Sequence, residues 1–267
     1  MAETLIKALV KNQLLAVPPV RERVMRRKYA RPYVPAKNSL EYVRDVYDNA
    51  STRIASHHPI TGTVLEIGPG GNLGATLLFI DAGCDHGVCI DAHPLLSDQS
   101  QLYRDLLPDA EQALAAVDYR HPDPIETTQL PDASFDIIFS AACLEHVPDP
   151  PAAIRSVYRM LKPGGATTHS IDLRDHRDFN RPHDFLRYSD RMWNLTYGRA
   201  LVNQNRWRAS DWEREFRTAG FVDIEIEPAE THAVDDQTRS EMASRFREMP
   251  AADLEMTLIN LTAVKPD

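Results

Sequence analysis

The hydrophobic positions of the chain change their period near residue 60. Before it, apolar residues recur at helical spacing over residues 5–15 and again over residues 39–54, so two helices are predicted. After it, short apolar runs alternate with helical stretches. These runs predict strands over residues 63–67, 88–90, 136–140, 166–173, 222–226 and 256–264. Such alternation predicts an α/β fold with a mostly parallel sheet covered by helices on both faces.

Turn and capping residues mark the helices between these strands. Pro108 breaks a predicted helix over residues 101–116. Asp149-Pro150-Pro151 starts another helix, which ends at Lys162-Pro163-Gly164-Gly165. The segment Ser210-Asp211-Trp212-Glu213 has the form of a capping box and predicts the start of the last helix before residues 222–226.

Composition narrows the class of protein. Of the 267 residues 43% are apolar, which excludes disorder over most of the chain. No apolar run reaches the ~20 residues that a membrane span needs. The three cysteines, Cys84, Cys89 and Cys143, form no CxxC pair and are too few for a disulfide framework. The chain is therefore expected in the cytoplasm, and its start, interrupted by lysines, fits a secretory signal poorly.

Charge is unevenly distributed along the chain. Residues 1–37 hold nine Lys and Arg against two acids, a net charge of +7, so the remainder carries -16 of the total of -9. The basic stretch from Arg21 to Arg31 could contact nucleic acid, anionic lipid or a phosphorylated substrate. A helical arm packed on its own acidic body is the favoured interpretation. The negative total also argues against a dedicated nucleic-acid binder.

A glycine-rich segment follows the first predicted strand: Val64-Leu65-Glu66-Ile67-Gly68-Pro69-Gly70-Gly71-Asn72-Leu73-Gly74. Glycines between a strand and a helix let the backbone approach a ligand closely at the carboxyl edge of the sheet. A structural turn or a nicotinamide-dinucleotide loop would also use them. Glu66 disfavours a dinucleotide, because a carboxylate serves a pyrophosphate poorly and a cationic group well. Leu73 also replaces the third glycine of a GxGxxG pattern.

A second acid, Asp91, ends the next strand, 25 residues after Glu66. A carboxylate there can accept hydrogen bonds from both hydroxyls of a ribose. A helix cap or turn residue is the alternative, and the position of Asp91 at a strand end, in register with Glu66, favours the ribose role.

These segments together resemble the class I S-adenosylmethionine-dependent methyltransferases. The resemblance spans roughly residues 63–173 and leaves residues 1–40 and 174–208 uncovered. It rests on the glycine segment, Ile90-Asp91, Leu130-Pro131-Asp132-Ala133-Ser134-Phe135-Asp136-Ile137-Ile138-Phe139-Ser140, Leu144-Glu145-His146-Val147-Pro148-Asp149-Pro150 and Leu161-Lys162-Pro163-Gly164-Gly165.

The resemblance implies a fold and a cofactor, S-adenosyl-L-methionine. The fold is a Rossmann-like, doubly wound, seven-stranded and mostly parallel sheet with helices on both faces and an antiparallel last strand. Glu66, Gly68 and Gly70 would hold the methionine part of the cofactor, and Asp91 the ribose. The adenine acid falls on Glu126, with Asp123 as a rival, and Ser140 completes the cofactor-binding candidates. Asn72 departs from the family, many members of which have a glycine there.

Methyl transfer to a hydroxyl needs a group that takes the proton. His146, after the strand predicted at residues 136–140, and His176, after the one at residues 166–173, are the catalytic candidates, because a neutral imidazole has a pKa suited to a base. Each could instead bond the backbone or orient the substrate. Asp172 joins them, since pairing with His176 would raise its basicity.

Two further features lie near these residues. Residues 169–184 are rich in metal-capable side chains, so Mg²⁺ is a minority alternative to the metal-free site that the sequence favours. The polar and aromatic insertion at about 174–208 suits a hydroxyl-rich acceptor, and a structural cap is the alternative for each of its aromatics. These aromatics are Phe179, Phe185, Tyr188, Trp193, Tyr197 and Trp207.

The sequence therefore predicts an N-terminal helical arm or lid over residues 1–55 and a methyltransferase domain over residues 56–267. The predicted reaction methylates a hydroxyl of a small polar acceptor, most plausibly a sugar or glycosylated metabolite. Three alternatives stay open: a small-molecule N-methyltransferase, a non-catalytic cofactor-binding scaffold that docks a partner through the basic arm, and, more distantly, a nicotinamide oxidoreductase. The oligomeric state is open, a homo-oligomer included.

Overall fold

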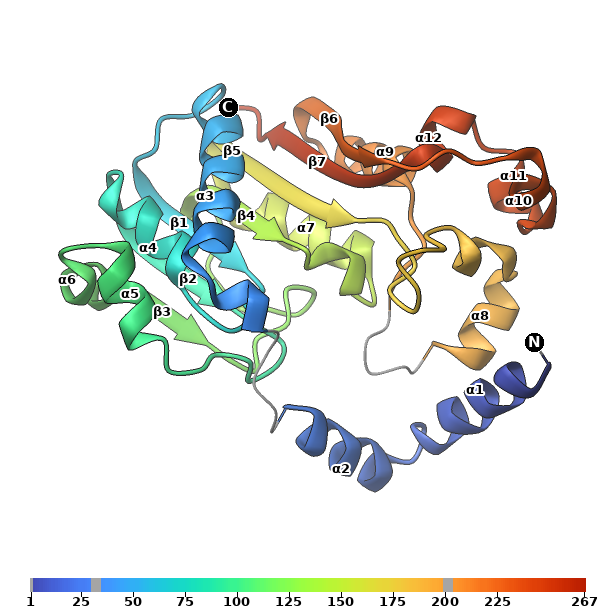
Figure 1. Cartoon of the computed structure of the whole chain (residues 1–267). Helices are drawn as coiled ribbons and strands as arrows, with labels where there is room; N and C mark the ends of the chain where they lie inside the picture. The colour runs from blue at the N-terminus through green and yellow to red at the C-terminus, as the bar shows by residue number, and fades with distance from the viewer. Residues whose placement is uncertain (1, 30–34, 199–203) are drawn as a thin grey trace.

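A seven-stranded sheet forms the centre of the described part of the chain, residues 2–29, 35–198 and 204–267 of the computed structural model (Figure 1). Its strand order is β3-β2-β1-β4-β5-β7-β6, with β1 to β5 parallel and β7 antiparallel to both neighbours. The predicted Rossmann-like α/β fold is therefore confirmed. The strands are β1 (Gly62–Ile67), β2 (Cys84–Ile90), β3 (Val117–Arg120), β4 (Phe135–Ala141), β5 (Leu161–Asp172), β6 (Val222–Thr231) and β7 (Met256–Val264).

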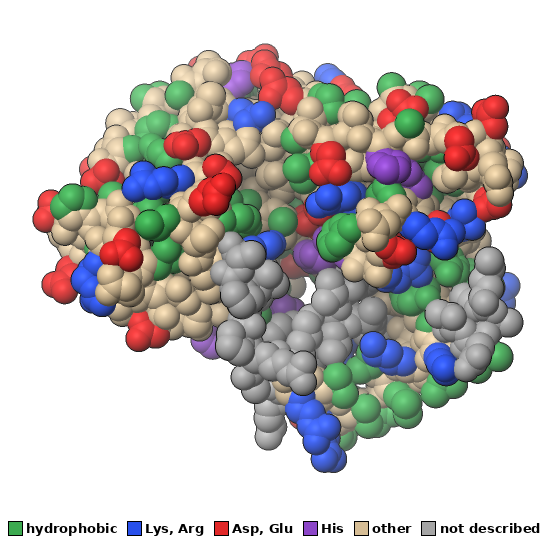
Figure 2. Space-filling model, in the orientation of Figure 1, with side chains coloured by type: hydrophobic (Ala, Val, Ile, Leu, Met, Phe, Trp, Pro, Cys, Tyr) green, Lys and Arg blue, Asp and Glu red, His purple; other side chains and the backbone are tan. Residues whose placement is uncertain are grey.

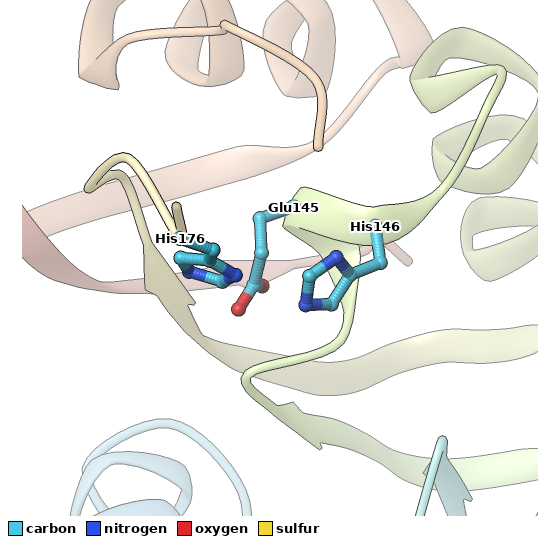
Figure 3. A group of neighbouring side chains, drawn as sticks. All are labelled: Glu145, His146 and His176. Atoms are coloured by element: carbon cyan, nitrogen blue, oxygen red, sulfur yellow. The ribbon is translucent and has the colours of Figure 1, made fainter. Parts of the chain in front are cut away.

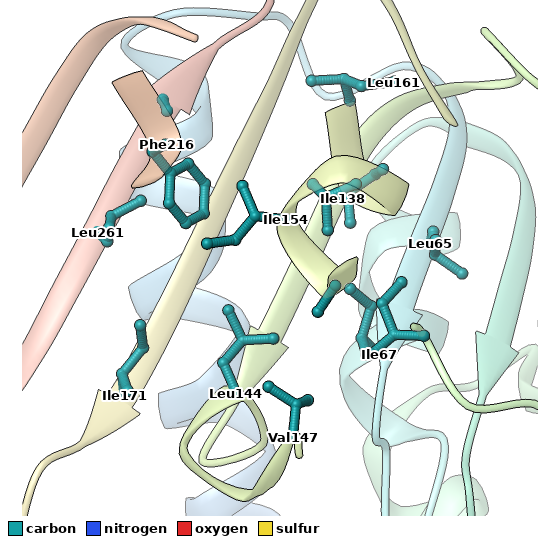
Figure 4. Packing of buried hydrophobic residues seen from close by; sticks show 14 of the residues in the cluster. Leu65, Ile67, Ile138, Leu144, Val147, Ile154, Leu161, Ile171, Phe216 and Leu261 are labelled. Carbon is teal, nitrogen blue, oxygen red and sulfur yellow. The ribbon is translucent and has the colours of Figure 1, made fainter. Parts of the chain in front are cut away.

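Successive residues of the buried strands point to opposite faces of the sheet, and each face has its own helices. On one face Leu65 and Ile67 pack in a cluster with Ile154 of α7 (Pro150–Met160) and Phe216 of α9 (Ala209–Ala219), as Figure 4 shows. The other face carries α3 (Leu40–Ala55), α4 (Gly74–Asp81), α5 (Ser100–Leu106) and α6 (Ala110–Ala115).

The predicted arm begins with α1 (Ala2–Leu14), α2 (Pro18–Tyr29) and η1 (Pro35–Asn38), and α1 contacts α8 (Asp190–Thr196). Asn12 is 2% exposed and donates from Nδ2 to the carbonyl oxygen of Leu195 at 2.8 Å. The predicted amphipathic helix is present. Ile6 and Val10 on it stay exposed, and Figure 2 shows hydrophobic side chains along the lower edge of the molecule with Lys and Arg among them.

Helix α3 ties the predicted arm to the sheet. Val43, Ala50 and Ile54 are buried, and Ile54 and Ala50 share a hydrophobic cluster with Val64 of β1. The domain boundary at residue 55 stays a prediction. None of the helices in the described residues has the length and apolar character of a membrane span.

Several local predictions were wrong or incomplete. Helix α9 begins at Ala209, not at Ser210: the Arg208 amide donates to Asp211 Oδ2 at 3.1 Å, while Ser210 Oγ donates to Asp253 Oδ2 at 2.5 Å. The segment Lys162 to Gly165 already belongs to β5. Not predicted were β3 and the helices α10 (Asp236–Glu241), α11 (Ser244–Arg247) and α12 (Ala251–Glu255).

Replacing Phe216 should test the core under α9. Its side chain is 0% exposed, and its ring lies 5.0 Å from that of Phe221. We expect Phe216→Ala to lower the free energy of unfolding in urea by about 3–5 kcal/mol, because the lost contacts leave a cavity. Val222→Ala, at a 41% exposed position, should change it by less than about 0.5 kcal/mol. Equal effects of the two substitutions would contradict this packing.

Candidate active site

The carboxyl ends of β1 and β2 bring the predicted cofactor residues together. Glu66 lies near the end of β1 and Asp91 directly follows β2, with exposures of 5% and 6%. Gly68 and Gly70 have φ angles of +71° and +70°, which favour glycine. A Cβ on Gly68 would also lie 2.5 Å from Cys143 Sγ. The bend after β1 therefore requires glycine for two independent reasons.

A cavity open to solvent lies against this bend and contains Glu66 and Gly68 in its wall; its empty space, with the solvent at its mouth included, is about 370 Å³. Lys37 of η1 and Tyr42 of α3 close it from the side of the arm. Sequence analysis missed both residues, because they lie outside the recognised motifs and only the folded chain brings them here. The full lining is Lys37, Tyr42, Val43, Val46, Glu66, Gly68, Pro69, Asn72, Ala75 and Ala141.

Asn72 has a structural role that a glycine could not fill. Its Oδ1 accepts a hydrogen bond from the Gly74 amide at 2.9 Å, at the start of α4. Its Nδ2 donates to the Lys37 carbonyl oxygen and to Asn38 Oδ1, both at 2.9 Å. The departure from the family pattern thus fastens the glycine segment to η1.

Burial shifts both carboxyl groups toward their neutral forms. It raises the pKa of Glu66 to about 7, against the lowering effect of hydrogen bonds from Thr76 and Cys89. Thr76 Oγ1 donates to Glu66 Oε2 at 2.5 Å. Burial also raises the pKa of Asp91 to about 6, although the amides of His93 and Gly70 donate to it. Removal from water makes the ionised forms costly, and a cation or hydroxyl donor bound here would offset that cost.

The structure gives the adenine candidates and Ser140 different surroundings. Glu126 and Asp123 are both half-buried in the loop after β3, and the Asp123 amide donates to the carbonyl oxygen of Asp91 at 2.9 Å. Ser140 Oγ is hydrogen-bonded to His169 Nδ1 at 2.8 Å and lines a second cavity of about 210 Å³ beside α3. It lies next to the first cavity rather than in its wall, and its cofactor role stays a prediction.

A second group of side chains forms where β4 and β5 end. Glu145 and His146 belong to η2 (Leu144–His146), and His176 follows β5 by four residues. One ligand atom from each lies within 4.8 Å of the others, and the two imidazole rings are 4.9 Å apart. Figure 3 shows Glu145 between the two rings. The two predicted histidines therefore lie next to each other. The sequence analysis named Glu145 only as part of a family motif and did not identify it as a site residue.

Glu145 is 1% exposed, and neither of its carboxylate oxygens has a hydrogen-bond partner. Burial raises its pKa to about 8; the polar backbone at Glu145 lowers it, the charge of Asp172 raises it further, and the charge of Lys37 lowers it. A buried carboxyl group without partners is rare in folded proteins.

Asp172, the third catalytic candidate, lies next to His176. Its Oδ2 is 3.4 Å from His176 Nε2 and 2.7 Å from Arg174 Nη2. Burial would raise the pKa of Asp172, but the contacts with His176 and Arg174 outweigh it and hold that pKa well below its usual range. Asp172 is therefore a carboxylate that can orient His176.

The described part of the insertion is mostly packed. Phe185 and Trp193 are buried with Phe246 and Leu254 in a small cluster, so the structural interpretation holds for these two aromatics. Phe179 is different: it is 55% exposed, and its ring lies 5.5 Å from that of His176. Residues 199–203 of the insertion lie outside the described residues.

The metal-capable residues of the segment 169–184 do not converge. His169 is 0% exposed and bonded to Ser140 and Thr167, and burial lowers its pKa to about 3. His183 Nε2 contacts the carbonyl oxygen of Leu254 at 2.9 Å. Asp175 pairs with Arg177. Of this segment only His176 joins the Glu145 group.

Comparisons with known proteins identify the family. A family model described as a methyltransferase domain matches residues 39–226. The ubiquinone biosynthesis O-methyltransferase of Pseudomonas fluorescens is 34% identical over 110 residues, 38% of this chain and 40% of that protein. The arsenite methyltransferase of Aquipseudomonas alcaligenes is 30% identical over 129 residues, 48% of this chain and 34% of that protein. The chain thus spans less than half the length of these relatives.

Solved structures share the fold. Phosphoethanolamine N-methyltransferase 2 of Haemonchus contortus, in complex with S-adenosyl-L-methionine, superposes with a TM-score of 0.53 at 18% identity, over 86% of this chain and 58% of that one. A Listeria monocytogenes protein described as an S-adenosylmethionine-dependent methyltransferase gives a TM-score of 0.51 at 14% identity, over 83% and 98%.

The raised pKa of Glu66 predicts that this residue lowers the free energy of unfolding as the pH rises. Between pH 4.5 and 7 the folded state binds this proton and the unfolded state releases it, so the stability contribution falls as the pH rises. Relative to the wild type, Glu66→Gln should gain about 3 kcal/mol in free energy of unfolding between pH 4.5 and pH 8 without ligand. Glu111→Gln, at an exposed position, is the control. A gap between Glu66→Gln and wild type that is constant over this range would refute the shift.

Proposed function

Because the chain belongs to the class I S-adenosylmethionine-dependent methyltransferases, we propose that it transfers a methyl group to a hydroxyl of a small polar acceptor, most plausibly a sugar or glycosylated metabolite. One observation carries the proposal: the cavity with Glu66 and the Glu145–His146–His176 group adjoin the same edge of the sheet. Cys143 links them, since its side chain packs on Gly68 and Glu145 follows two residues later.

In this proposal the cavity holds the cofactor by charge and hydrogen bonding. Ionised Glu66 faces the ammonium group of the methionine part, and Asp91 accepts hydrogen bonds from the ribose hydroxyls. Lys37 lines the same cavity and carries the charge that suits the cofactor carboxylate. Glu126 or Asp123 takes the adenine amino group.

The reaction needs alignment and a proton acceptor. The acceptor oxygen attacks the methyl carbon, a carbon–oxygen bond forms, the carbon–sulfur bond breaks and the sulfonium becomes a neutral thioether. The hydroxyl proton passes to His146 or His176. Asp172, 3.4 Å from His176, acts as a positioning residue.

The acceptor side supports a polar, ring-shaped ligand. Phe179 offers an exposed aromatic face beside His176, and Arg174 lies 4.8 Å over the same ring. Such a mixture suits sugars, which present apolar ring faces and many hydroxyls. The named relatives and the structural neighbour act in ubiquinone biosynthesis, on arsenite and on phosphoethanolamine, so the sugar acceptor rests on the residues of this chain alone.

An N-methyltransferase is the second candidate. The carboxyl groups of Glu145 and Asp172 lie close enough for their charges to interact and could attract an amine. A non-catalytic scaffold is the third, and it requires cofactor binding without turnover.

Three free cysteines in the described residues agree with the proposed cytoplasmic location.

Removing the Asp91 carboxylate should weaken cofactor binding. We expect Asp91→Ala to lower the affinity for S-adenosylhomocysteine by about 10- to 100-fold, the value of hydrogen bonds to a charged group. Isothermal titration calorimetry measures this, with the exposed Asp85→Ala as the control. An unchanged affinity would remove the ribose role.

Removing either histidine separates O- from N-methylation. For a hydroxyl acceptor, His146→Ala or His176→Ala should lower kcat by about 10²- to 10⁴-fold while S-adenosylhomocysteine still binds. Release of S-adenosylhomocysteine with a panel of nucleotide sugars and glycosylated metabolites provides the assay, and His86→Ala the control. Turnover that survives both substitutions would favour an amine acceptor.

A further inference from the structure

The Glu145 carboxylate lacks the partners that a buried charge needs. Both its oxygens and His176 Nε2 are buried without a hydrogen bond. An unmade hydrogen bond costs about 1–3 kcal/mol for a buried polar group and more for a charged one. The three atoms belong to neighbouring side chains of one cluster, so a single bound ligand could satisfy all of them.

The donor set indicates which ligand fits. It offers one carboxylate and two imidazoles, with the ligand atoms within 4.8 Å of one another. Mg²⁺ and Ca²⁺ favour sites made of oxygen atoms, whereas imidazole suits the divalent ions of the first transition series. Two imidazoles and one carboxylate are a known ligand combination for such ions, and they leave coordination positions open.

The surrounding charges agree with a cation. Asp172 Oδ2 lies 3.4 Å from His176 Nε2 and places a second carboxylate beside the cluster. Arg174 neutralises part of this charge through its ion pairs with Asp172 and Glu230, and Lys37 opposes it from the cofactor side. Glu145 itself forms no salt bridge within 4.0 Å among the described residues.

We propose that Glu145, His146 and His176 bind one divalent cation of the Mn²⁺, Fe²⁺, Co²⁺ or Zn²⁺ class. The role of the cation rests on the proposed function: its open positions take two neighbouring oxygens of the acceptor, such as a vicinal diol. The acceptor class thereby narrows to molecules with adjacent oxygen donors. A bound cation would lower the pKa of the hydroxyl that it contacts, so that this hydroxyl loses its proton to solvent water and no histidine base is needed.

Glu145 distinguishes this proposal from a simple histidine base. A bound cation occupies the imidazole lone pairs that would otherwise accept the hydroxyl proton. Replacing a histidine therefore removes a metal ligand and a general base together, and cannot separate the two roles. A general-base mechanism gives Glu145 no task, whereas the cation proposal makes it a ligand. Glu145→Gln keeps the size of the buried side chain and removes its charge.

The test is a metal titration of the full chain after treatment with a chelator. Co²⁺, followed by its visible absorption, and Mn²⁺, followed by calorimetry, should each bind at one ion per chain. Glu145→Gln and His176→Gln should weaken binding by at least about 10-fold, as expected for the loss of a ligand. Glu111→Gln and His86→Gln are matched surface controls, and circular dichroism with S-adenosylhomocysteine affinity verifies that each variant folds.

The outcomes separate the two proposals. Absence of stoichiometric binding by the wild type, or equal binding by Glu145→Gln, overturns the cation site. Turnover by cation-free enzyme would leave the methyltransferase proposal intact and remove the role of the ion. Stoichiometric binding lost in the variants supports the site, even where S-adenosylhomocysteine fails to bind and the proposed function falls.

Discussion

The removal of two carboxyl groups from water, at the ends of adjacent parallel strands, is the constraint on which the site depends. β1 and β2 run in the same direction, so Glu66 and Asp91 reach the same edge. The glycine bend and α3 then cover them, and burial raises both pKa values. Packing of apolar residues on both faces of the sheet must compensate for that cost. Without a ligand the protein is therefore less stable than it would be with uncharged side chains at these two positions, and a bound ligand would offset that cost.

The Glu145–His146–His176 group depends on a different pair of strands, β4 and β5. β5 pairs with the parallel strand β4 on one side and with the antiparallel strand β7 on the other, and it ends at Asp172, four residues before His176. η2 brings Glu145 and His146 from β4 to the same place. Two short segments, η2 and the residues directly after β5, therefore supply all the titratable groups of the cluster.

Prediction from sequence gave the fold class and the positions of residues where the signal is local, while the cofactor roles of those residues stay predictions. Glu66, Gly68 and Asp91 lie in strand-to-loop motifs whose geometry follows from parallel pairing, and the fold class follows from alternating strands and helices. The sequence did not identify Lys37 and Glu145 as site residues, because their positions in the site depend on contacts between distant segments. It did not predict β3, because this strand has only four residues and none of them is fully buried. Ser210 was misread because the Asp211 carboxylate accepts from the Arg208 amide, two residues before the expected cap.

The small cluster of Phe185, Trp193, Phe246 and Leu254 shares none of its fully buried members with the clusters on the sheet. Mutations that repack it therefore leave the interior around β1 and β2 undisturbed. Over evolutionary time such a division lets substitutions accumulate in this cluster while the residues packed around β1 and β2 are inherited unaltered. Divergence among relatives should accordingly concentrate in residues 185–193 and 242–254, because α9 and β6 between them pack on the central sheet.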